Sequence, residues 1–148
     1  MTIRKATDEE PCPVARSVDL IGDRWSLLIV RDAFDGVRRF GDFQRSLGVA
    51  RNILADRLRK LVDAGILEMR DASDGTAYQE YVLSTKGEGL FPIVVALRQW
   101  GELHLFARGE RHSVLIDTRT RKPIPRMTPQ AKDGSTLMPA FTEVRKVT

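Results

Sequence analysis

The stretch ARNILADRLRKLVDAG, residues 50–65, carries six charged side chains and still has the spacing of an amphipathic helix. With about 100° of rotation per residue, Leu58, Leu61 and Val62 fall within about 80° of Leu54 and form one apolar seam. Gly65 is suited to end the helix. The opposite, polar face holds Asn52, Asp56, Arg59, Lys60 and Asp63, with Ile53 at its edge.

Three shorter helices are predicted before this stretch. PVARSVDLIG (13–22) starts with proline and ends with glycine, and DRWSLLIVRDAFDG (23–36) offers Asp23 as an N-cap. RRFGDFQRSLG (38–48) ends at a glycine and is followed by only a short connection. Helical spacing gives each segment one apolar face, made of Val14, Val18 and Ile21, then Trp25, Leu28, Ile29 and Phe34, then Phe40, Phe43 and Leu47.

A β-hairpin is predicted after the stretch. ILEMR (66–70) and YQEYVLS (78–84) are rich in residues that favour strands, and Asp74-Gly75 between them is a strong turn signal. Helix, helix, short turn, helix and hairpin is the order of a winged helix-turn-helix. The predicted fold class is α+β, mainly α.

A final long helix is predicted from a capping-box pattern at Thr85 and Glu88, with a kink at Pro92. It is more apolar than a solvated helix of a small domain should be, and a partner helix from a second chain would explain this. The expected C-terminal dimerisation stripe consists of Leu90, Val94, Leu97, Gly101 and Leu105.

The chain of 148 residues, 42% of them hydrophobic, suits one globular domain with an appended segment. The expected division is a DNA-binding and dimerisation domain over 11–108 and a small β-rich tail over 109–148. The tail holds four of the seven prolines. Its segments 112–125 and 135–147 are predicted to form short strands around the Asp133-Gly134 turn.

The net charge of +4 is distributed unevenly. Residues 1–108 hold sixteen basic and sixteen acidic side chains, whereas residues 109–148 hold eight basic and four acidic ones. Within the balanced part, residues 38–60 form a cluster with an excess of five positive charges, which is typical of a surface that binds a polyanion. An ordinary solvated surface is the alternative interpretation. The basic cluster comprises Arg38, Arg39, Arg45, Arg51, Arg57, Arg59 and Lys60, against Asp42 and Asp56.

Other classes of protein find little support. The sequence contains no GxGxxG, P-loop, HExxH or CxxC pattern, and its two histidines have no cysteine near them, so we expect no enzyme, metal or cofactor. No apolar run is long enough to span a membrane, and MTIRKATDEEPCP does not resemble a secretory signal. A single cysteine fits a reducing cytoplasm, where we expect the protein to associate with the nucleoid.

Binding to duplex DNA has a direct mechanism in this sequence. A helix fits the major groove, and residues at its start reach base edges. Arg51 and Asn52 are therefore candidate readers of guanine and adenine, and Ile53 is suited to a thymine methyl group. The candidate phosphate contacts are Arg59, Lys60, Arg38, Arg39 and Arg45. Winged helices also serve as protein–protein modules, and this remains the alternative function.

Two charged residues of the same helix have competing interpretations. Asp56 lies at the centre of the polar face, where it either accepts from a cytosine amino group or pairs with Arg59 or Lys60, and pairing is favoured. Arg57 lies at the flank, where it is expected to brace helices through an ion pair.

Several motifs occur together in order: Cys-Pro at 12–13, Gly-x-Arg-Trp at 22–25, Arg-Phe at 39–40, Arg-Leu-x-x-Leu at 57–61, and Tyr-x-Leu-Ser-x-x-Gly at 81–87. With these, residues 11–106 closely resemble the HxlR-type transcriptional regulators, bacterial relatives of the MarR winged-helix proteins. The resemblance implies a homodimer joined through the first and last helices, with Val14 and Val18 at the interface. It also implies a sequence-specific regulator, commonly a repressor, that binds a palindromic operator and responds to oxidants, electrophiles or small molecules.

The resemblance implies that residues 50–64 are the recognition helix and 70–80 the wing, with Arg70, Tyr78 and Gln79 as wing contacts. The chain departs from the family pattern at Ala50, where a serine or similar cap is usual. Its wing has Tyr78 and Gln79 where a proline and a basic residue are usual, and it also carries Asp71 and Asp74. Phosphate contact by the wing is therefore expected to be weak.

Cys12 is a candidate redox sensor, because in the resembling family the cysteine of this Cys-Pro pair senses oxidants. A helix N-terminus favours the reactive thiolate, whereas Asp8, Glu9 and Glu10 oppose it. With one cysteine per chain, any disulfide joins two subunits or a small thiol. The alternative interpretation is that Cys12 only packs or caps.

Overall fold

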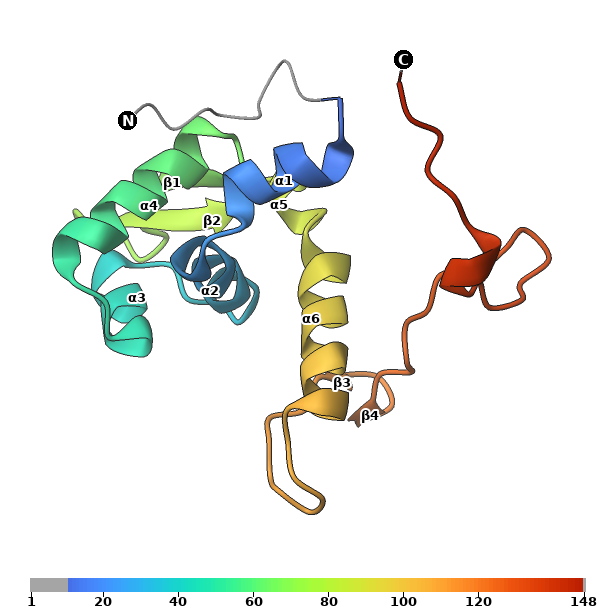
Figure 1. Ribbon diagram of the computed structural model, residues 1–148. Coiled ribbons are helices and arrows are strands. Elements are labelled where there is room, and N and C mark those ends of the chain that lie inside the picture. Colours follow the sequence, from blue (N-terminus) through green and yellow to red (C-terminus); the bar gives the residue numbers. More distant parts are fainter. Residues whose placement is uncertain (1–10, 148) are drawn as a thin grey trace. The chain divides into compact units, whose positions relative to one another are not determined.

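The computed structural model describes residues 11–147, and it divides into two compact units, one ending at Val94 and the other beginning at Val95. Figure 1 shows the order of the elements along the chain. They are α1 (Pro13–Ile21), α2 (Arg24–Phe34), α3 (Phe40–Leu47), α4 (Arg51–Asp63), β1 (Leu67–Asp71), β2 (Gln79–Leu83), α5 (Thr85–Glu88), α6 (Phe91–His104), β3 (Ile116–Asp117), β4 (Lys122–Pro123) and a 3₁₀ turn, η1 (Pro139–Phe141).

The core of the first unit lies where α2, α3 and α4 meet the hairpin β1–β2. The apolar seam predicted on α4 is confirmed, since Leu54, Leu58 and Leu61 are fully buried. Burying each such side chain stabilises the fold by roughly 1.5–3 kcal/mol before entropy is counted. The other buried apolar residues of this core are Ile21, Ile29, Val30, Phe43, Val49, Ile66 and Leu67.

The helix ends follow from local hydrogen bonding. The carboxylate of Asp23 accepts from the N–H of Ser26 at 3.0 Å, which confirms it as the N-cap of α2. Gly48 ends α3 with a φ of 62°, a backbone conformation that residues other than glycine rarely adopt. At the C-terminal end of α4, the Nζ of Lys86 donates to the carbonyl of Ala64 at 2.8 Å and so satisfies one of the last carbonyl acceptors of the helix.

The hairpin is antiparallel, with a register from Leu67 opposite Leu83 to Asp71 opposite Gln79. At its turn, the carboxylate of Asp74 accepts from both the N–H and the hydroxyl of Thr76. The N–H of Tyr81 donates to the carbonyl of Arg38 at 2.7 Å, so the segment before α3 is attached to β2. The predicted winged helix-turn-helix is confirmed, with this hairpin as its wing.

The start of the last helices differs from the prediction. The N-cap is Ser84 and not Thr85, because the Ser84 hydroxyl accepts from the N–H of Gly87 and also lies 3.1 Å from the carbonyl of Ile66. The helix stops at Glu88 and a new one begins at Phe91, so Pro92 falls in a first turn and causes no kink. The predicted single kinked helix is therefore wrong.

In the second unit, polar side chains of α6 bind the tail: Arg98 donates to the Ser113 hydroxyl at 2.8 Å, and Gln99 makes two further contacts. The Nε2 of Gln99 donates to the carbonyl of Pro125 at 3.0 Å, and its Oε1 accepts from the N–H of Met127 at 2.7 Å. Strands β3 and β4 pair over two residues each, and Gln130 forms an isolated bridge with Thr136. The strand predicted over 135–147 is wrong beyond that bridge, because residues 139–141 form η1, with Pro139 in its first turn.

None of the helices within residues 11–147 has the length and hydrophobicity that spanning a bilayer requires.

Candidate nucleic-acid interface

The first turn of α4 presents polar side chains and uncapped amides. Arg51 and Asn52 are exposed, whereas Ile53 is half-buried and packs partly against the core. No side chain caps the N-terminus of α4 at Ala50 or of α3 at Arg39. By contrast, α1, α2 and α5 each have a side-chain cap. Free amides at a helix N-terminus favour an anionic partner.

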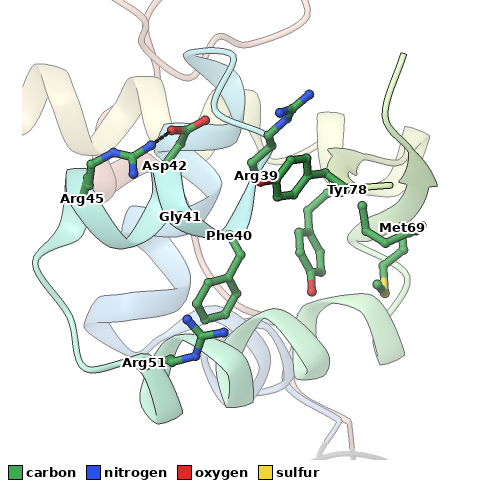
Figure 2. Close-up of a pocket in the computed structure, with 10 residues that line it drawn as sticks. Arg39, Phe40, Gly41, Asp42, Arg45, Arg51, Met69 and Tyr78 are labelled. Carbon is green, nitrogen blue, oxygen red and sulfur yellow. Dashed lines mark hydrogen bonds and ion pairs between the residues drawn. The ribbon is translucent and has the colours of Figure 1, made fainter. Parts of the chain in front are cut away.

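A pocket of about 590 Å³ lies between α3, the first turn of α4 and the wing (Figure 2). We call it the wing pocket. Three arginines and three aromatic side chains contribute to it, so it combines positive charge with flat apolar surfaces. Its lining residues are Arg39, Phe40, Gly41, Asp42, Arg45, Arg51, Met69, Tyr78, Gln79 and Tyr81.

Arg51 is the arginine of the wing pocket that pairs with no carboxylate among the described residues. Its guanidinium instead lies over the Phe40 ring, 4.9 Å from the centroid, and Figure 2 shows the two side chains pointing toward one another. A cation on an aromatic face is held in place while its N–H groups stay available to another partner. Arg51 is therefore both oriented and available to bind an anion or a base edge.

Arg39 makes two contacts within the protein. It forms an ion pair with Asp74 at the wing turn, and its guanidinium lies 4.9 Å from the centroid of the Tyr78 ring. Hydrogen bonds from the Thr76 hydroxyl and N–H, with a further contribution from Arg39, lower the pKa of Asp74 to about 2. The carboxylate therefore stays ionised at neutral pH, and Arg39 is neutralised locally.

The two other predicted phosphate contacts before α4 are also paired. Arg45 forms an ion pair with Asp42 one turn earlier on α3, which Figure 2 marks with a dashed line. Arg38 lies 3.4 Å from the carboxylate of Glu80, which is buried in β2. These pairs leave the basic cluster less positive than the sequence alone indicates.

Asp56 organises the cations on the rest of α4. Its carboxylate lies 2.6 Å from Arg57, 2.7 Å from Arg59 and 3.3 Å from Lys60. The hydrogen bond from Arg59 is the largest cause of the lowered pKa of Asp56. The favoured interpretation of Asp56 as an ion-pair partner is confirmed. Arg57 also donates to Asp23 at 3.0 Å, which confirms that it braces α4 against the start of α2.

Wing residues are likewise engaged with one another. Arg70 pairs with Glu68 on its own strand at 2.9 Å. The amide of Gln79 donates to Asp71 at 2.8 Å across the hairpin. Tyr78 is exposed apart from its contact with Arg39. The wing therefore offers no basic side chain that is without a carboxylate partner within the hairpin.

The comparison with known proteins fits this geometry. Residues 20–108 match the family model described as HxlR-like helix-turn-helix. The chain belongs to the HxlR-like helix-turn-helix family. The predicted resemblance is confirmed. The match ends at residue 108, which is also the domain boundary predicted from the sequence. The two compact units of the structure instead meet inside α6, between Val94 and Val95. The boundary after residue 108 remains a prediction.

Named relatives and solved structures agree with this membership. An HTH-type transcriptional regulator of Mycobacterium bovis, Mb3122, is 46% identical over 92 residues, and the match covers 62% of this chain and 58% of that relative. YybR of Bacillus subtilis, also described as an HTH-type transcriptional regulator, is 32% identical over 64% of this chain and 77% of its own length. This chain thus spans less than two thirds of the length of its mycobacterial relatives.

Two solved structures show how far the likeness extends. The crystal structure of PA1607, whose proposed role is that of a transcription factor, is 51% identical and covers 94% of this chain and 97% of its own, with a TM-score of 0.89. The redox regulator HypR in its reduced form is 30% identical and covers 64% of this chain and 94% of its own, with a TM-score of 0.58. The likeness to PA1607 therefore extends into the tail, beyond the HxlR-like region.

The surfaces predicted to join two HxlR-like chains are partly apolar and exposed. On α1, Val14 and Val18 are 69% and 57% exposed. On α6, Leu97 is exposed and Gly101 is half-buried, and Leu105, directly after the helix, is exposed. Leu90 and Val94, by contrast, pack partly against the core of the first unit.

Two exposed apolar residues of α6 were not among those predicted from the sequence for the dimer surface. Ile93 and Trp100 are exposed, and the Trp100 ring contacts the His104 ring in a tilted arrangement with 5.1 Å between ring centroids. Together with Leu97 they follow an i, i+4, i+7 spacing, which is the signal that would have found them.

Cys12 is exposed and is the N-cap of α1. Its Sγ accepts from the N–H of Ala15 at 3.5 Å. The thiol is thus accessible, and it also has the capping role that was the alternative interpretation. Asp8, Glu9 and Glu10, which were expected to oppose its ionisation, lie outside the described residues. Within residues 11–147, no three His, Cys, Asp or Glu side chains are grouped to hold a metal ion.

Proposed function

We propose that the protein is a sequence-specific DNA-binding transcriptional regulator that inserts α4 into the major groove. The observation that carries this proposal is the exposed first turn of α4. There Arg51, oriented by Phe40 and lacking a carboxylate partner among the described residues, stands beside Asn52 at the rim of a basic pocket. The names of the HTH-type relatives support the same function.

Base readout is assigned to the first turn. An arginine recognises guanine through O6 and N7, and an asparagine recognises adenine through N6 and N7. Arg51 and Asn52 take these roles, and the exposed part of Ile53 contacts a thymine methyl group. Because Ile53 is half-buried, its contribution is the smallest of the three.

Phosphate contacts are assigned to the cations around this turn. Arg59 and Lys60 are exposed on α4, and Arg38 and Arg45 are exposed near α3. Each of these side chains must leave or share a carboxylate in order to bind DNA, because Asp56, Glu80 and Asp42 hold them in the free protein. Their net contribution to affinity is therefore smaller than that of unpaired cations.

We further propose that two chains form a homodimer through the apolar residues of α1 and α6. Val14 and Val18 on α1 and Leu97 and Trp100 on α6 are large apolar side chains exposed to solvent in one chain. A dimer places two recognition helices on half-sites about one helical turn, ~34 Å, apart, so the operator is palindromic. Such a dimer acts in the cytoplasm as a repressor when the operator overlaps a promoter.

Regulation by oxidants is proposed at Cys12. An oxidant such as diamide accepts two electrons and two protons as two thiols form one disulfide, either between two subunits or with a small thiol. Because Cys12 caps α1, the new S–S bond competes with the contact between Sγ and the Ala15 N–H and so alters the first turn of a helix assigned to the dimer interface. The reduced structure of the redox regulator HypR, 30% identical, supports this assignment.

The redox proposal is tested with Cys12→Ser, which keeps a capping side chain. Diamide is expected to weaken operator binding by the native protein and to leave the variant unchanged. An equal response of both proteins would refute a role for Cys12.

The DNA-binding proposal is tested by a gel shift with duplex from upstream of its own gene, titrated across a salt series. Affinity is expected to fall steeply and log-linearly with salt, because cations on the protein release counterions from DNA. No measurable binding at low salt would overturn the proposal and favour a protein–protein module.

A further inference from the structure

An ion pair between Arg39 and Asp74 joins the segment before α3 to the wing turn, and Arg39 is also one of the residues predicted to contact DNA phosphates. Arg39 is 31% exposed and Asp74 49% exposed at the side chain, so their ion pair lies at the molecular surface, and Arg39 also lines the wing pocket. The pair joins residues far apart in sequence, and it places a carboxylate where the basic cluster faces solvent.

We propose that Asp74 occupies Arg39 in place of a DNA backbone phosphate, and so acts as a built-in competitor that weakens DNA binding. This inference rests on the proposed function and adds a regulator of affinity to it. The ligand that Asp74 competes with is a phosphodiester group of duplex DNA.

Asp74 holds its position without help from Arg39. Its Oδ1 accepts from the N–H of Thr76 at 3.0 Å and from the Thr76 hydroxyl at 2.8 Å, whereas Arg39 binds the other oxygen, Oδ2. The carboxylate therefore stays in the wing turn when the guanidinium turns away. Arg39 is the movable partner of the pair.

A second contact, with the Tyr78 ring, keeps Arg39 near the pocket when it leaves Asp74. The Tyr78 ring lies under its guanidinium at 4.9 Å, and a cation–π contact restricts the direction of the side chain without occupying its N–H groups. Arg45 and Arg51 line the same wing pocket. A phosphate there meets several cations, whereas Asp74 offers a single solvent-exposed carboxylate, and exposed ion pairs are weak.

The exchange has a measurable consequence for salt dependence. While Arg39 is paired with Asp74, its charge is compensated by the protein and contributes little to counterion release. When Asp74 is replaced by a neutral residue, Arg39 adds one unpaired cation to the DNA-binding surface. The slope of log K against log salt should then steepen by up to about 0.9, the value for one neutralised phosphate.

The chain provides a matched control in a second wing aspartate. Asp71 is exposed, accepts from the amide of Gln79 and forms no ion pair with an arginine among the described residues. D71N and D74N remove the same charge from the same hairpin. An asparagine at position 74 keeps an oxygen for Thr76, so the turn is preserved.

The experiment compares duplex binding by the native protein, D74N and D71N over a salt series, and repeats both substitutions in an R39Q background. D74N is expected to bind several-fold more tightly than D71N, with a steeper salt slope. In the R39Q background the two variants should bind alike. Circular dichroism and thermal unfolding of each variant verify that the hairpin change has not unfolded the protein.

Three results would overturn the inference. They are equal binding by D74N and D71N in the native background, weaker binding by D74N than by D71N, and a difference between the two that persists without Arg39. Failure of the native protein to bind any duplex at low salt is a separate result, which overturns the proposed function itself.

Discussion

The two ends of the exposed face of α4 carry their charges in different ways. In the first turn, Arg51 stacks on Phe40 and pairs with no carboxylate among the described residues. In the following turns, one carboxylate, Asp56, holds Arg57, Arg59 and Lys60 together. Charges that look alike in the sequence are thus available at one end of the helix and partly compensated by a shared carboxylate at the other.

This difference separates specificity from general affinity. A side chain that reads a base edge must have free hydrogen-bonding groups and a fixed direction, and Arg51 has both. Compensated cations can still contact phosphates, but each contact costs an internal ion pair. The account therefore assigns sequence recognition to the first turn and a modest, sequence-independent contribution to the later ones.

The largest expected effect is on stability and comes from the buried face of α4, which supports both ends of the exposed face. Leu58→Ala should lower the free energy of unfolding by about 2–5 kcal/mol, because Leu58 is fully buried and leaves a cavity. Urea unfolding followed by circular dichroism measures the change. Arg59→Ala on the opposite, exposed face serves as the control and should change stability by less than about 0.5 kcal/mol.

Arg51→Ala should weaken binding to a selected operator by about 10- to 100-fold, corresponding to roughly 1–3 kcal/mol for a lost base contact. Thermal unfolding should remain close to that of the native protein, since the side chain is exposed. Fluorescence anisotropy with a labelled duplex gives the affinity. A loss of less than twofold would mean that the availability of Arg51 has no role in recognition.

Arg59→Gln and Lys60→Gln should each weaken binding only a few-fold and equally for operator and unrelated duplex. The reason is that each cation contributes to phosphate binding only what remains after Asp56 is displaced. Asp56→Asn should act in the opposite direction and tighten binding to both duplexes. Tightening confined to the operator would contradict the assignment of Asp56 as a counter-ion.

The smallest effect concerns pH at the wing. The pKa of Asp74 is lowered to about 2 by Thr76 and Arg39, so its contribution to stability is complete above its unfolded value near 3.8 and is lost as pH falls towards 2. A carboxyl NMR titration should show Asp74 still ionised at pH 3 in the folded protein. In R39Q its pKa should move upward, but only in part, because Thr76 remains.

Local contacts explain what the sequence was able to predict. The seam of α4, the Asp23 cap and the pairs of Asp56 with Arg59 and Lys60 join residues three to four positions apart, where helical geometry alone brings side chains together. The hairpin followed similarly from its Asp74-Gly75 turn signal.

Nonlocal contacts explain what sequence reasoning missed. The pairing of Arg39 with Asp74 depends on where the wing turn lies after folding. Ser84 replaced Thr85 as the cap because it also contacts the carbonyl of Ile66, which lies on a different element. Both contacts require the tertiary structure, and no spacing rule along the chain indicates them.

The most direct test of the central claim is the ratio of operator affinity to unrelated-duplex affinity for Asn52→Ala and Arg59→Ala, using an operator that the native protein selects from a random pool. Asn52→Ala should lower this ratio by about 10-fold or more and relax selection at one base pair, whereas Arg59→Ala should leave it unchanged. An unchanged ratio for Asn52→Ala, or an equal fall for both variants, would contradict the assignment of base recognition to the first turn of α4.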